Sequence, residues 1–142
     1  MVQPRLLRAL VAAYGSERGC EATAEALGYA WEHWRRVRRM EHPLSYLYRV
    51  GQSRTRPRKR PPMLAWDVPV NTDGVSGYEP GLPAALASLT EAQRVAVVLV
   101  HGYGWTLREV AELTAVAVST VQSHTERGLT KLRTALEVTD GA

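Results

Sequence analysis

The sequence predicts an all-α protein made of two small helical domains joined by an extended linker. Apolar residues recur three and four positions apart in several stretches, which is the period of an amphipathic helix, and no stretch alternates as a strand would. A segment rich in Pro and Gly separates the two helical parts. We therefore expect a three-helix domain at residues 1–57, an acidic linker at residues 58–83 and a second helical domain at residues 84–142.

The N-terminal domain is expected to contain three helices. Pro4 suits the first turn of the first helix, and Gly15 ends it. A second helix is predicted from residue 17 or 21 to 39, and a third from Pro43 to just before Pro57. The apolar stripe of the second helix would be buried and would consist of Leu27, Ala30, Trp31, Trp34 and Val37. The third helix would bury Leu44, Leu47, Tyr48 and Gly51.

The C-terminal domain carries three pairs of residues that match the capping box, in which a cap hydroxyl and a later side chain satisfy free backbone groups at the start of a helix. These pairs are Thr90 with Gln93, Thr106 with Glu109, and Ser119 with Gln122. They predict three helix starts, with a GYGW break after the first helix and a last helix that runs to about residue 138.

Residues 112–124, ELTAVAVSTVQSH, have the spacing of a helix-turn-helix. Ala115 stands where the turn often needs a left-handed residue, and a non-glycine residue there costs about 1 kcal/mol. The second helix either starts uncapped after Ala117 or takes Ser119 as its cap.

The outer face of the second helix of this hairpin carries short polar and basic side chains, which could meet the major groove. Gln122 can bond adenine through both amide atoms, and Arg127 can reach a guanine or a phosphate. The candidate DNA-reading residues are Ser119, Thr120, Gln122, Ser123, His124, Arg127 and Lys131. A solvated polar face on a small helical bundle is the alternative interpretation of the same composition.

Charge is distributed unevenly along the chain. Residues 1–60 hold 13 Arg and Lys against 5 Asp and Glu, whereas residues 61–83 hold 3 acidic residues and no basic one. A basic N-terminal part favours a polyanionic partner such as nucleic acid. The single Cys20 excludes an internal disulfide, and the histidines offer no metal or catalytic spacing, so we expect no cofactor and no catalytic residues. No apolar run approaches a membrane span or a good signal peptide, and a cytoplasmic protein is expected.

Together these segments resemble the sigma-70 family of bacterial RNA polymerase sigma factors, in its small two-domain extracytoplasmic-function form. The text SLTEAQRVAVVLVHGYGWTLREVAELTAVAVSTVQSHTERGLTKLRTAL is similar to sigma region 4 over its whole length, and ATAEALGYAWEHWRRV followed by HPLSYLYRVGQS is similar to a shortened sigma region 2. The resemblance implies a transcription initiation factor that binds core RNA polymerase and promoter DNA. It also admits an anti-sigma or other regulatory partner.

The resemblance further implies roles for individual residues. Those implied to bind polymerase are Glu21, Glu25, Trp34 and Arg35. Those implied to capture the minus-10 element as single-stranded DNA are Tyr46, Arg49, Gln52, Ser53, Arg54 and Arg56. The candidate DNA-reading residues would read the duplex minus-35 element. Gln122 and His124 stand where the family commonly has Lys or Arg, so we expect weak DNA binding by the C-terminal domain alone.

Two other classes of function remain open from the sequence. The chain could be a stand-alone helix-turn-helix regulator, similar to the LuxR type, that binds duplex DNA as a dimer. It could also be a degenerate sigma-like module that binds other proteins without recognising promoters.

Overall fold

The computed structural model describes residues 2–55 and 81–140, and within these ranges it is helical without any strand, which confirms the predicted fold class. The N-terminal helices are α1 (Val2–Tyr14), α2 (Ser16–Glu32), α3 (Trp34–Val37) and α4 (Pro43–Arg54). The C-terminal elements are α6 (Leu82–Ala87), α7 (Glu91–Val97), the π-helix η1 (Val98–Gly102), α8 (Leu107–Thr114) and α9 (Val118–Asp140). Most of the expected linker lies outside the described residues. α6 begins at Leu82, one residue before the expected end of the linker at residue 83. Over the described residues, no helix has the length and apolar character needed to cross a bilayer.

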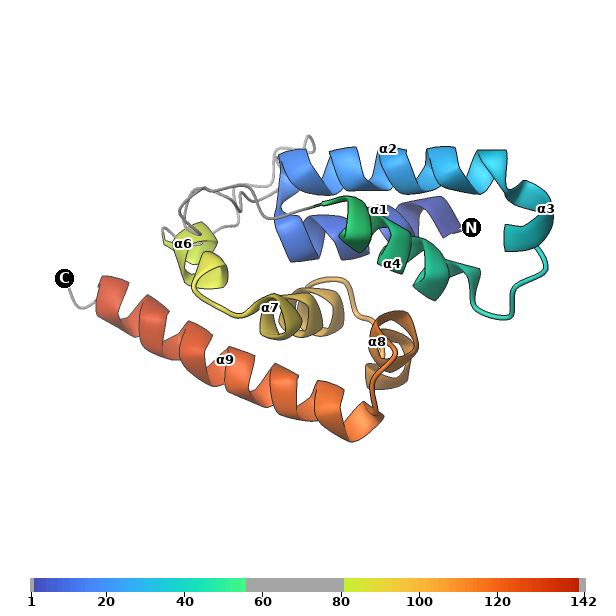
Figure 1. Cartoon of the computed structure of the whole chain (residues 1–142). Helices are drawn as coiled ribbons and strands as arrows, with labels where there is room; N and C mark the ends of the chain where they lie inside the picture. Colours follow the sequence, from blue (N-terminus) through green and yellow to red (C-terminus); the bar gives the residue numbers. More distant parts are fainter. Residues whose placement is uncertain (1, 56–80, 141–142) are drawn as a thin grey trace.

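The helices are stacked in tiers (Figure 1). α2 and α9 lie on opposite outer sides, and α1 and α4 lie next to α2. The elements α7 and α8 lie between that layer and α9. α1 contacts α7 and η1, while α4 contacts α8, so the N-terminal and C-terminal helices meet in the middle of the molecule.

A single cluster of buried apolar side chains runs through this middle layer. Its fully buried larger members come from both parts of the chain: Leu6, Leu10, Val37, Val95, Leu99, Val110 and Val121. A smaller cluster lies under α6 and α9 and contains Leu86, Ala87, Leu89 and Val97. Burial of apolar area in this main cluster stabilises the packing of the helices within residues 2–55 and within residues 81–140. It also stabilises the contact between these two halves of the chain.

The second helix differs from its prediction in length and in its buried face. It ends at Glu32, and a break at His33 separates it from α3. Its buried face is lined by small residues four apart, which let neighbouring helices approach: Ala22, Ala26 and Ala30. Trp31 lies one residue beyond this stripe and is 84% exposed, and Trp34, after the break, is 56% exposed. The prediction that both tryptophans belong to the core is therefore wrong, whereas Leu47 and Tyr48 of α4 are buried as expected.

Two of the three predicted capping boxes are confirmed. Thr90 caps α7 and Thr106 caps α8, each with both reciprocal hydrogen bonds present. The third is wrong, because α9 begins at Val118 and Ser119 lies inside its first turn. That helix therefore starts after Ala117, the uncapped alternative.

Candidate nucleic-acid interface

The turn between α8 and α9 gives the C-terminal part its helix-turn-helix geometry. α8 ends on Ala115, which adopts the left-handed conformation with φ 58° and ψ 42°. The amide of Val116 then donates to the carbonyl of Ala111 over 3.2 Å and closes the helix end. At the start of α9, the carbonyl of Ala117 accepts from the amides of Thr120 and Val121 over 3.0 and 3.1 Å. The turn forms with an alanine at each position where glycine or a capping side chain would be favoured.

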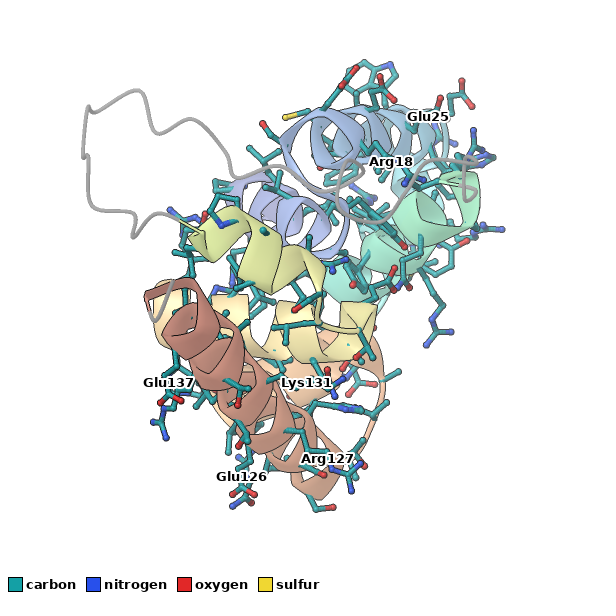
Figure 2. All side chains as sticks on the ribbon, turned by 90° about the vertical axis from the view of Figure 1, so that its left-hand side faces the viewer. Arg18, Glu25, Glu126, Arg127, Lys131 and Glu137 are labelled. Carbon is teal, nitrogen blue, oxygen red and sulfur yellow. The ribbon has the colours of Figure 1, made fainter. Side chains whose placement is uncertain are left out.

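α9 packs against the other helices through one face and leaves the face that carries the candidate DNA-reading residues open. Val121, Thr125 and Gly128 are buried. Of the candidates, Ser119, Gln122, Arg127 and Lys131 are exposed, and Thr120, Ser123 and His124 are half-buried. Figure 2 shows Glu126 and Arg127 at the opposite end of the molecule from Glu25 of α2. The face of α9 that carries the candidate DNA-reading residues, called the reading face below, is therefore on the outside of the fold.

The polar groups on this face differ in what they can recognise. Gln122 Nε2 donates to Glu126 Oε1 over 3.4 Å, so a carboxylate orients the amide of the candidate adenine reader. Arg127 and Lys131 supply positive charge, while Glu126 adds a negative one on the same surface. The face combines groups that could bond bases with only a small net charge, and the expectation of weak DNA binding by the C-terminal domain alone stays a prediction.

A second cluster of polar aromatic groups joins α2 and α4 in the N-terminal part. The hydroxyls of Tyr29 and Tyr46 lie 2.8 Å apart, and Arg36 donates to both hydroxyls, at 2.9 Å for Tyr46. The hydrogen bond with Tyr29, together with the positive charge of Arg36, lowers the pKa of the Tyr46 phenol below its ordinary value. Tyr46 is half-buried and packs on the main core. Tyr29 and Arg36 were not predicted from the sequence, because their contacts with Tyr46 depend on how α2 and α3 lie against α4.

The other residues expected at the minus-10 element differ in exposure and in their partners. Arg49 and Ser53 are exposed, and the Ser53 hydroxyl bonds the carbonyl of Val50 in its own helix over 2.9 Å. Arg54 forms an ion pair with Glu25 of α2 at 3.2 Å, and Gln52 donates to Glu91 of α7 over 3.3 Å. Arg56 lies outside the described residues.

The residues expected to bind polymerase lie at the surface. Glu21, Glu25, Trp34 and Arg35 are all exposed, and Glu25 is engaged by Arg54. Trp34 and Arg35 line a shallow hollow together with Trp31 and Arg36. An exposed tryptophan pair beside arginines is an apolar and cationic surface of the kind enriched at protein interfaces. In residues 2–55 and 81–140, no three His, Cys, Asp or Glu side chains group closely enough to hold a metal ion.

The fold and the exposed α9 face define the class of protein as an all-helical DNA-binding protein of the helix-turn-helix type. Residues 81–132 match the family model described as "Sigma-70, region 4". This match confirms the resemblance of that segment to sigma region 4 that was drawn from the sequence. The match supports a sigma factor role in transcription.

A comparison with solved structures shows the fold over nearly the whole chain. The structure described as "Co-crystal structure of the sigma factor RpoE in complex with the anti-sigma factor NepR from Bartonella quintana" is similar to it with a TM-score of 0.69. The two sequences are 19% identical, and the match covers 96% of this chain and 92% of that chain. A comparison with curated protein sequences found no match.

Proposed function

We propose that the protein is a promoter-reading initiation factor without catalytic activity, which binds core RNA polymerase in the cytoplasm and directs it to DNA. In this proposal residues 84–142 form the domain that reads the duplex minus-35 element through the exposed face of α9. The observation that carries it is the match of residues 81–132 to sigma-70 region 4 together with the open outer face of α9, which no other helix of the described residues covers.

The domain at residues 1–57 would supply the other contacts. Tyr46, half-buried beside Arg36, would stack on an unpaired base, and the exposed Arg49 would bind a phosphate. The exposed Trp34 and Arg35, with Glu21 and Glu25, would dock on polymerase. The compared sigma factor was solved with an anti-sigma factor, and this supports a protein regulator of similar kind for this chain.

A reconstituted transcription assay tests the proposal. Core RNA polymerase from the same bacterium is mixed with the protein and a promoter library, and the expected result is a set of transcripts that start downstream of a shared sequence. The matched variants are a triple substitution of the reading face, Gln122→Ala, Ser123→Ala and Arg127→Ala, and the control Arg133→Ala near the far end of α9.

The rival functions predict different outcomes in that assay. Specific binding to a duplex operator without polymerase would favour the stand-alone regulator. Wild-type polymerase binding without any promoter-dependent transcript, unaffected by the triple substitution, would favour the protein-interaction module. Loss of transcription in the triple variant with retention in Arg133→Ala supports promoter reading by α9.

A further inference from the structure

A carboxylate lies beside the candidate adenine reader on the exposed reading face of α9. Nε2 of Gln122 donates to Oε1 of Glu126 over 3.4 Å, and both side chains are exposed. Residues four apart lie on the same side of a helix, one turn after the other, so the two side chains would enter a major groove together. Glu126 is not one of the candidate DNA-reading residues.

The bond to Glu126 leaves Gln122 with the groups that adenine needs. A glutamine amide has two N–H donors and one carbonyl oxygen. Bidentate pairing with adenine uses the oxygen to accept from N6 and the N–H beside that oxygen to donate to N7. The other N–H points away from the oxygen and can bond Glu126 at the same time. An ionised carboxylate only accepts, so it faces the nitrogen end of the amide and turns the oxygen away.

The Glu126 carboxylate keeps further acceptor sites after this bond. An ionised carboxylate has two oxygens with about four lone-pair sites, and Gln122 takes one of them. Among the described residues no Arg or Lys forms an ion pair with Glu126. Figure 2 shows Arg127 on another side of α9. The carboxylate can therefore accept from a donor that approaches the reading face from outside.

The four bases differ in what they offer such a carboxylate. In the major groove cytosine presents the N4 amino donor, whereas guanine presents the acceptors N7 and O6 and thymine presents the acceptor O4 beside a methyl group. Adenine presents its N6 donor next to the acceptor N7. A carboxylate against guanine or thymine would lose water without gaining a hydrogen bond, which is costly for a charged group. Glu126 therefore favours cytosine most and opposes guanine most.

We propose that Glu126 determines base specificity on the reading face by selecting cytosine over guanine, while it positions Gln122 on a nearby adenine. Four residues advance about 6 Å along α9, and base pairs are stacked about 3.4 Å apart, so the two bases lie one or two base pairs from each other. The inference rests on the proposed function, because it requires α9 to enter a major groove, and it adds which bases the duplex element contains.

Selection from random duplex DNA tests the inference. A library randomised over the minus-35 region is incubated with the full-length protein in two arms, with core polymerase from the same bacterium and without it at low salt. The bound sequences are then counted. The parent should select an adenine and, within two base pairs of it, a cytosine. Guanine at that second position should weaken binding about 5- to 150-fold, the usual effect of one mismatched base pair.

Substitutions of Glu126 separate its two roles. Glu126→Gln keeps an acceptor for Gln122 and adds an amide donor, so adenine should stay selected while the discrimination against guanine is lost. Glu126→Ala should lose both preferences. In a Gln122→Ala background, Glu126→Ala should have no further effect at the adenine position, because the group that it positions is absent. Circular dichroism checks that each variant stays folded.

The matched control is Glu137→Gln. Glu137 is also exposed, and it lies on the same side of α9 as Glu126, about 16 Å further along the helix (Figure 2). Its replacement removes the same charge from the same helix and should leave both base preferences unchanged. A loss of discrimination in Glu137→Gln equal to that in Glu126→Gln would show that net charge alone is responsible and would overturn the inference.

The remaining outcomes distinguish this inference from the proposed function. Promoter binding by the polymerase complex with the same base preferences in the parent and in all Glu126 variants would overturn the inference and leave the proposed function standing. The expected changes in a protein that binds duplex DNA but not polymerase would support the inference and count against the proposed function. The absence of any selected sequence in both arms would overturn both.

Discussion

α2 crosses α1 in backbone contact at Gly19 and Val11. A Cβ atom placed on Gly19 would lie 2.5 Å from the Cα of Val11 and 2.7 Å from its amide nitrogen. Neither backbone atom can move without displacing α1, so this pair sets the distance between the two helices. α1 also contacts α7, so the distance between α1 and α2 affects how the N-terminal helices pack against the C-terminal helices.

Replacement of this glycine tests the crossing directly. Gly19→Ala should destabilise the protein by about 1–3 kcal/mol, as expected when a methyl group is forced into a packed site. Gly28→Ala is the matched control on the same helix, where a new Cβ meets nothing within 4 Å. It should stabilise by up to about 1 kcal/mol through helix propensity. Urea unfolding followed by circular dichroism gives both values, and equal effects of the two substitutions would contradict the close crossing.

The left-handed alanine in the turn predicts a stabilising substitution. Ala115→Gly should raise the free energy of unfolding by about 1 kcal/mol, because glycine adopts φ 58° without a clash of its Cβ. Ala24→Gly, on the exposed side of α2, should lower it by a similar amount. Opposite shifts of the thermal midpoint would show that the sign depends on backbone conformation, and a loss of stability in Ala115→Gly would refute the left-handed turn.

The capping box of α8 predicts that the free energy of unfolding falls at acid pH. The amide of Thr106 donates to the Glu109 carboxylate over 3.0 Å, and this bond, with Arg5 nearby, holds the pKa of Glu109 below its ordinary value. A carboxyl with a lowered folded pKa stabilises the protein fully above its unfolded value near 4.5, and the contribution is lost as the pH falls through the folded value.

The Glu109→Gln variant should therefore be less stable than the parent at neutral pH. Its stability should also fall less steeply as the pH is lowered. Glu112→Gln removes the same charge from the exposed side of α8, outside the capping box, and should keep the parental profile. Unfolding midpoints measured between about pH 7 and 3 compare the three proteins. If the midpoint of Glu109→Gln falls with pH as steeply as that of the parent, the capping box does not cause the loss of stability in acid.

Two neighbours on the reading face of α9 should affect DNA binding in different ways. Arg127→Ala should weaken the holoenzyme on all promoters and reduce the salt dependence of binding by about one ion, if this arginine meets a phosphate. Gln122→Ala should leave the salt slope unchanged and relax the base preference at one position, at a cost of about 1–3 kcal/mol on the preferred sequence. Binding titrations over a range of salt on matched promoter variants separate the two effects. If only Gln122→Ala changes the salt dependence of binding, then Gln122 and not Arg127 contacts the phosphate.

Local signals in the sequence were sufficient for the helices of the C-terminal part. Thr90 and Thr106 specify helix starts by bonds within four residues, so their capping boxes could be predicted without any tertiary information. The same holds for Ala115, whose position after α8 demands a left-handed residue whatever its type. Ser119 also matches the capping-box pattern, but the prediction that it caps α9 is wrong. The length of the turn after Ala115 places the start of α9 at Val118.

The sequence by itself determined the all-α class, the two helical parts, the helix-turn-helix and its outward polar face, because periodicity and capping act over a few residues. Only the tertiary structure decided which face of α2 is buried. Trp31 directly follows Ala30 in the sequence, and the packing of α1 and α4 against α2 decides which of the two is buried. It alone joined Tyr29, Tyr46 and Arg36. It also decided that Arg94 binds the end of α1, more than eighty residues away. Such contacts depend on how whole helices cross, and no local pattern in the chain encodes that geometry.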